Sequence, residues 1–115
     1  MKIRLGFVSN SSSTSFTIRN TTDEEKTLVD FVVENADLLD QFKKKYDWHK
    51  NNPRFTQNQM MVDAGDLNRT FKPKESRVLI FGDEDGTTIG NVYDYILRDG
   101  GSSKSFAWEF KEFLR

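Results

Sequence analysis

Residues 76–101, SRVLIFGDEDGTTIGNVYDYILRDGG, decide how the chain folds, because the hydrophobic pattern changes its period within this stretch. Residues 77–81 form a short run of β-formers between turn residues, which predicts a strand. Residues 82–86, GDEDG, are too polar and too rich in glycine to continue the strand, so they predict a turn.

A helix is predicted from residue 88 onward. Its apolar residues recur at the spacing of one helix face: Ile89, Val92, Tyr93, Ile96 and Leu97. Thr87 or Thr88 can cap its start, and Gly100 can adopt the left-handed conformation that ends a helix.

The composition fits one globular domain, residues 1–115. Ten phenylalanines, three tyrosines and two tryptophans supply large side chains for a core, and the formal net charge of −1 argues against a highly basic nucleic-acid-binding protein. With no cysteine and one histidine, disulfides and thiolate zinc sites are excluded and no cofactor is expected. The sequence lacks a signal peptide and any stretch long enough to span a bilayer, which predicts a cytoplasmic protein.

The N-terminal part predicts two strands separated by a polar segment. Residues 2–8 alternate charged and apolar side chains, and residues 16–19 alternate again. Between them, residues 9–15, SNSSSTS, predict a flexible connector, because hydroxyl side chains compete for backbone hydrogen bonds and favour turns.

The opening MKIRLGFVSNSSSTSF resembles an N-terminal signature, approximately GFVSNSSSSSF, of uncharacterised proteins of bacteriophages and some bacteria. The later block FGDEDGTTIGNVYDYILRDGG, followed by an aromatic strand, also resembles members of such phage sets. In this chain Thr14 interrupts the serine run. The resemblance covers about 40 residues. It implies a phage-type genomic setting and carries no catalytic residue with it.

Two helices are predicted for residues 23–34 and 37–46. Thr22 and Glu25 have the spacing of a capping box at the start of the first helix. Asn35 interrupts the apolar face, and Asp37 can cap a second helix that ends in the solvated basic run 43–45.

The remainder alternates loops and short elements. Residues 47–53 predict a loop, 56–64 a short helix, 68–72 a strand and 73–75 a turn. Residues 105–114 alternate aromatic and polar side chains, which predicts a last strand with one buried face. The sequence therefore predicts an α+β domain of two layers. Its antiparallel or mixed sheet is built mainly from residues 16–19, 77–81 and 105–114, and helices cover one face.

The acidic turn could carry chemistry, because Asp83-Glu84-Asp85-Gly86-Thr87 follows a strand and spells DxDGT. The motif is similar to the first motif of the haloacid-dehalogenase phosphohydrolases. That resemblance implies Asp83 as nucleophile and Asp85 as general acid/base, with Mg²⁺ offsetting the phosphate charge. Gly82 separates the strand from the first acid, and only 28 residues follow Thr87, too few for the further strands that carry the family's other groups. A turn whose acids stabilise a helix N-terminus explains the same residues, and the spacing of an EF-hand is not met.

Two further groups could form binding surfaces. Asp94 and Arg98 stand one helical turn apart and can pair, and Arg98 with Asp99 and two glycines could present a recognition edge. On the last strand, Trp108, Phe110 and Lys111 could stack on nucleic-acid bases, although the core needs the same aromatic side chains.

The sequence favours a small non-enzymatic accessory protein of phage type that binds another protein, either a host factor or a component of a phage assembly. Its contact surface is expected at residues 82–88 and 98–101. The expected binding residues are Asp83, Glu84, Asp85, Thr87, Arg98 and Asp99. A nucleic-acid-binding module is the alternative, followed by a metal-dependent phosphohydrolase.

Overall fold

The computed structural model describes residues 13–45, 55–82 and 87–114. Its strands are β2 (Ser13–Asn20), β3 (Lys26–Thr27), β4 (Thr70–Phe71), β5 (Ser76–Gly82), β6 (Gly101–Ser102) and β7 (Phe106–Leu114). Its helices are α1 (Leu28–Glu34), α2 (Asp37–Lys45), α3 (Gln57–Leu67), α4 (Thr88–Ile96) and the short 3₁₀ helix η3 (Leu97–Asp99).

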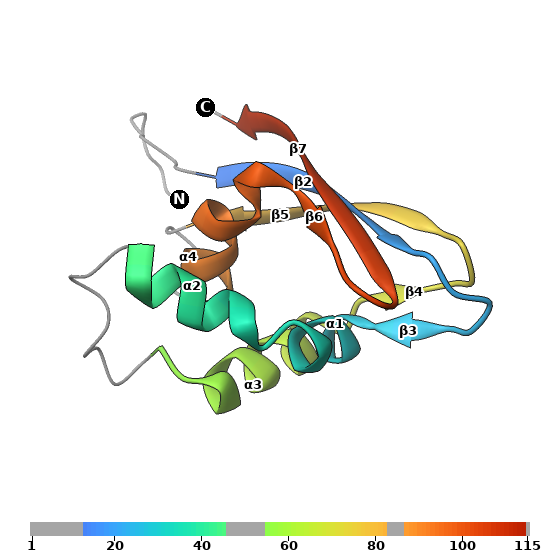
Figure 1. Cartoon of the computed structure of the whole chain (residues 1–115), viewed down its shortest axis with the longest axis horizontal. Coiled ribbons are helices and arrows are strands. Elements are labelled where there is room, and N and C mark those ends of the chain that lie inside the picture. The colour runs from blue at the N-terminus through green and yellow to red at the C-terminus, as the bar shows by residue number, and fades with distance from the viewer. Residues whose placement is uncertain (1–12, 46–54, 83–86, 115) are drawn as a thin grey trace.

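The main sheet of the described residues has four strands in the order β5-β2-β7-β6, and all neighbours are antiparallel. β2 is therefore central, with β5 on one side and β7 on the other (Figure 1). The prediction that the second, fourth and last predicted strands build the sheet is confirmed. β3 and β4 form a separate two-stranded ribbon.

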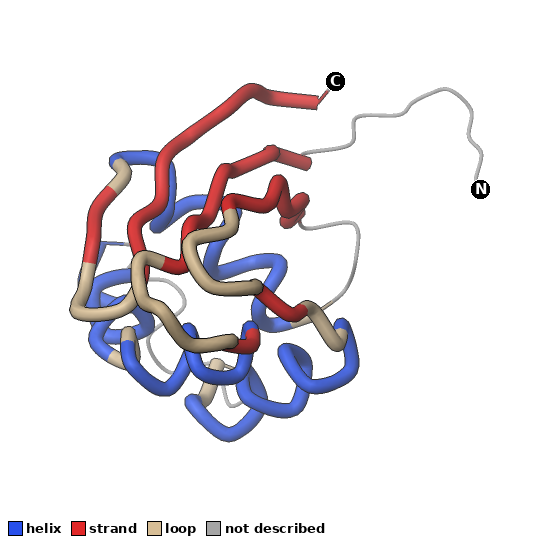
Figure 2. Tube along the Cα trace, turned by 90° about the vertical axis from the view of Figure 1, so that its right-hand side faces the viewer, coloured by secondary structure: helices blue, strands red, loops and turns tan. Residues whose placement is uncertain are grey.

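The helices pack on one face of the main sheet, which confirms the predicted α+β architecture (Figures 1 and 2). Phe31 of α1 lies at the centre of the core between these layers. Its ring centroid lies 5.1 Å from that of Phe106, 5.3 Å from that of Trp108 and 5.5 Å from that of Tyr93. All three contacts are edge-to-face, the geometry that aromatic quadrupoles prefer. Among the described helices, none combines the length and apolarity that crossing a bilayer requires.

The break between α1 and α2 is confirmed, but the predicted capping box is wrong. Thr27 accepts a hydrogen bond from the backbone N–H of Asp30, and the Asp30 carboxylate accepts one from Thr27 N–H. Thr22 instead donates its hydroxyl to the side chain of Asn20, in the turn that follows β2. Because that turn leads into β3, helix α1 begins at Leu28 and not at residue 23.

The polar segment predicted for residues 9–15 overlaps a strand. β2 begins at Ser13, and its residues Ser13–Ser15 are buried and paired with both β5 and β7, so they are not part of a flexible connector. The strand predicted for residues 2–8 lies outside the described residues, as do residues 47–53.

The predicted helix at residues 56–64 extends further, to Leu67, because Thr56 caps its start and Asn68 ends it in the left-handed conformation. Asn68 therefore belongs to the helix end, and the strand predicted for residues 68–72 shortens to β4. At the other end of the chain, Gly100 follows η3 with a positive φ of 71°, as glycine allows, but its ψ of 177° differs from the left-handed conformation predicted for it.

Candidate functional site

The predicted acidic turn is described only at Thr87, since Asp83, Glu84 and Asp85 lie outside the described residues. Thr87 is the N-cap of α4, and its side chain accepts a hydrogen bond of 3.0 Å from Gly90 N–H. Asp63 of α3 accepts from Thr88 N–H at 2.9 Å and from Ile89 N–H at 3.2 Å. The positive end of α4 is thus already compensated by a carboxylate of the fold, a contact that the sequence analysis did not find.

Arg98 is half-buried, and its side chain contacts Asp94, Tyr95 and Phe113. Its Nε donates to the Asp94 carbonyl at 2.7 Å, and its Nη2 donates to Asp94 Oδ1 at 3.2 Å, as the helical spacing predicted. Its guanidinium carbon lies 4.6 Å from the ring centroid of Tyr95 and 5.0 Å from that of Phe113. These contacts leave Arg98 a structural role at the junction of α4 and β7.

Asp94 is fully buried, which the sequence analysis did not predict. The Thr14 hydroxyl donates to Asp94 Oδ1 at 2.5 Å across the boundary between β2 and α4. A buried carboxylate needs such partners, because its desolvation is otherwise unfavourable by several kcal/mol. The pair Asp94–Arg98 is therefore part of the core boundary and not a surface ion pair.

Asp99 lies at an open polar groove of about 420 Å³. It forms an ion pair of 3.4 Å with Lys45, and both side chains are mostly exposed. The groove is lined by Glu34, Asn35, Asp37, Leu38, Gln41, Lys45, Ile96, Asp99, Gly100, Gly101, Ser102, Ser103 and Trp108. The predicted recognition edge at residues 98–101 thus borders a real groove through Asp99 and the two glycines, without Arg98.

Glu34 fastens one wall of this groove. Its Oε2 accepts hydrogen bonds from the Ser103 hydroxyl and, at 2.8 Å, from Ser105 N–H. Partial burial opposes ionisation of Glu34, but the hydrogen bonds from both serines and the charge of Lys26 outweigh it and lower the pKa of this carboxyl below its ordinary value. Glu34 is consequently engaged in holding the turn before β7.

The predicted site residues do not come together. Thr87 precedes the first turn of α4, whereas Arg98 and Asp99 follow its last turn, so they lie at opposite ends of one helix. Trp108 is only 7% exposed and packs on Phe31, and a Cβ on Gly101 would lie 2.8 Å from its ring. The predicted aromatic platform is therefore reduced to Phe110, which is 37% exposed.

The surface that the sequence analysis missed is the outer edge of β5. Hydrogen-bonded and non-hydrogen-bonded residue pairs alternate along an antiparallel ladder. The hydrogen bond from Asn20 N–H to Glu75 C=O therefore shows which residues of β5 bond to β2. It follows that Arg77, Leu79 and Phe81 direct their main-chain groups toward β2. The groups of Ser76, Val78 and Ile80 point away from it, and no described strand pairs with them. We call these outward main-chain groups, with the side chains of Val78 and Ile80, the β5 edge.

The β5 edge is apolar and unusually open. Val78 and Ile80 are 51% and 55% exposed. Sheet edges are commonly protected by shortness, by bulges, or by lysine and proline. At the opposite edge, β6 has only two residues and pairs with Trp108 and Ala107 of β7. β5 has seven residues, contains neither lysine nor proline, and pairs with β2 without a bulge.

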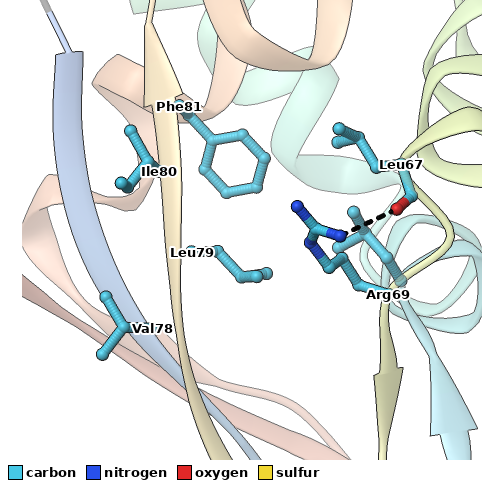
Figure 3. Close-up of a pocket in the computed structure, with 7 residues that line it drawn as sticks. Leu67, Arg69, Val78, Leu79, Ile80 and Phe81 are labelled. Carbon is cyan, nitrogen blue, oxygen red and sulfur yellow. Dashed lines mark hydrogen bonds between the residues drawn. The ribbon is translucent and has the colours of Figure 1, made fainter.

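A pocket of about 140 Å³ adjoins this edge on the helix side of the sheet. Figure 3 shows Leu79 and Phe81 pointing from β5 toward Leu67 and Arg69, whereas Val78 and Ile80 point to the other side of the strand. Leu28 completes the lining. The pocket is smaller than the cavities that hold drug-sized ligands, and its volume suits one aliphatic side chain.

Within the described residues, no group of three or more histidine or acidic side chains is arranged to hold a metal ion. Comparison with protein-family models, with curated proteins and with solved structures finds no match to this chain.

Proposed function

We propose that this chain is a small non-enzymatic accessory protein that acts by binding another protein. The observation that supports the proposal is the β5 edge. β5 is a seven-residue strand with two half-exposed aliphatic side chains, and none of the described strands pairs with its outer side. Such an edge offers main-chain hydrogen bonds for affinity and alternating side chains for specificity. The resemblance of residues 1–16 to phage proteins supports a phage-type setting, with action in the host cytoplasm on a host factor or within a phage assembly.

Affinity purification of the full chain from host lysate, with identification by mass spectrometry, tests this function. We compare wild type with Val78→Lys at the β5 edge and Val33→Lys on α1, because the two valines are 51% and 53% exposed. One protein is expected to co-purify with wild type and Val33→Lys and to bind both when purified. Val78→Lys is expected to lose this binding while circular dichroism shows that its fold is intact. If no purified host or phage protein binds wild type, the proposal is overturned.

The same preparations test the predicted acidic turn. If the turn contributes to the contact, Asp83→Ala weakens binding of the purified partner while Asp23→Ala, in the turn after β2, does not. If the partner binds wild type, Asp83→Ala and Asp23→Ala with equal affinity, residues 83–85 are not part of the contact surface.

A further inference from the structure

The β5 edge also indicates the chemistry of the segment that it binds, an inference that rests on the proposed function. We infer that it accepts an extended segment of the partner that carries carboxylates toward the helix side of the sheet and β-branched side chains on the opposite face. The segment would extend the sheet beyond β5. Its backbone would pair with the outward groups of Ser76, Val78 and Ile80.

Two arginines supply the charge preference. Arg69 borders the pocket and donates Nη1 to the Leu67 carbonyl at 3.2 Å, while Arg77 of β5 donates Nη1 to the Thr70 carbonyl at 2.8 Å. Neither forms an ion pair with a carboxylate of the described residues. Each guanidinium has five N–H donors, so both keep donors for an incoming carboxylate.

The same charges argue against two other occupants. A second copy could pair its β5 antiparallel to this one, centred on Val78, and this would place Arg77 opposite Leu79 of the partner subunit. Such pairing would bring the arginines of two copies together, and β5 has no acidic residue to offset their charge. Residues 2–8 of the chain carry Lys2 and Arg4 and no acid. Charge complementarity therefore favours an acidic segment of a different protein.

On the outer face, Val78 and Ile80 are the complement for β-branched side chains of the added strand. Cross-strand aliphatic pairs of this kind stabilise neighbouring strands. On the helix side, the pocket between Leu79, Phe81 and Leu67 has room for one aliphatic side chain beside the carboxylates.

Fluorescence anisotropy with synthetic peptides tests the charge preference on the full chain. One labelled peptide alternates valine with threonine and glutamate, and its counterpart has lysine in place of glutamate. We expect the glutamate peptide to bind about ten-fold more tightly, the ratio that about 1.4 kcal/mol of charge-assisted hydrogen bonding gives. Arg69→Glu is expected to abolish or reverse this preference, whereas Arg19→Glu, an equal charge change on the other face of the sheet, leaves it intact. Equal binding of the two peptides, or no binding of either, would overturn the inference.

Amide hydrogen exchange measured by NMR identifies the bound edge, with neighbouring residues of the same strand as controls. In the free chain the amides of Val78 and Ile80 are expected to exchange faster than those of Arg77 and Leu79, which face β2. The glutamate peptide should slow exchange at Val78 and Ile80. Protection in the free chain at every concentration would mean that the chain itself covers the edge, and protection that rises with concentration would indicate a second copy. Either result would overturn the inference.

The outcomes of the two sets of experiments are separable. A co-purified partner whose affinity is unchanged by Arg69→Glu and by Val78→Lys would leave the proposed function in place and refute the acidic-strand model. Loss of that partner's binding with both variants, but not with Arg19→Glu, would support the model.

Discussion

Replacing Thr14 by valine tests the buried network that joins β2 to α4. The change removes one hydroxyl and keeps a β-branched side chain of similar shape in a strand. Thr14 and Asp94 are both fully buried, and the hydroxyl donates to Asp94 Oδ1 at 2.5 Å. The other carboxylate oxygen of Asp94 has no hydrogen-bond partner within the described part of the chain. After the substitution, Arg98 alone would satisfy this side chain.

The magnitude follows from the charge of the acceptor. A hydrogen bond to a charged group contributes about 1.5–3 kcal/mol, and leaving a buried carboxylate under-satisfied costs an amount of similar size. We therefore expect Thr14→Val to lower the free energy of unfolding by about 2 kcal/mol. With an m-value of about 2 kcal/mol/M in urea, the unfolding midpoint falls by about 1 M.

Urea unfolding followed by tryptophan fluorescence and far-ultraviolet circular dichroism provides the measurement. The matched control is Thr17→Val, which makes the same change in the same strand at a half-buried residue with no side-chain hydrogen bond in the described structure. This control should change stability by less than about 0.5 kcal/mol. If Thr14→Val costs no more than Thr17→Val, the hydroxyl does not stabilise Asp94 and the network described here is refuted.

Three further substitutions test local geometry. Gly101→Ala should destabilise the fold by about 1–3 kcal/mol in thermal unfolding, because its Cβ would lie 2.8 Å from Trp108 Cζ2. The control Gly65→Ala should be neutral or stabilising, because its Cβ meets nothing closer than 4.0 Å. Similar melting temperatures of the two variants would contradict this packing. Thr87→Ala should cost about 1 kcal/mol in urea unfolding through loss of the bond from Gly90 N–H, and Thr87→Ser should restore most of it; an alanine variant as stable as wild type would show that the cap is dispensable. For Glu34, a lowered folded-state pKa means that the carboxylate stabilises the fold above its unfolded value near 4.5, and that this contribution is lost as the pH falls through the folded pKa. Glu34→Gln should therefore be less stable than wild type at pH 7, and the difference in unfolding free energy should shrink below about pH 4. If that difference grows in acid instead, the pKa of Glu34 is raised and not lowered.

Several local features were predictable because they depend on neighbours in the sequence. The apolar stripe from Ile89 to Leu97 places α4 on the core, and Thr87 caps it as expected. Asn35 separates α1 from α2, and the aromatic alternation after Ser105 forms β7. Side-chain period and capping chemistry act over one or two turns of chain, so one sequence suffices to find them.

The candidate binding surface was not predictable in the same way. The apolar run 78–81 has the same appearance in a central strand as in an edge strand, because sequence period does not report which strands lie on either side. It is the order β5-β2-β7-β6 that leaves the outer side of Ser76, Val78 and Ile80 without a neighbouring strand among the described residues. The fold also brings Arg69, from the link between α3 and β4, to the pocket beside them.

The sequence by itself determined the class of the fold, three of the four strands of the main sheet and the helix faces, since these follow from the alternation of apolar and polar side chains. Tertiary structure alone decided that Thr14 meets Asp94, 80 residues away, and that Glu34 holds Ser103 and Ser105. It also decided that Arg98 donates hydrogen bonds to Asp94, while no other described strand pairs with the β5 edge. The physical reason is that hydrogen bonds and ion pairs between distant residues depend on how the elements pack against one another, and local sequence carries no record of that arrangement.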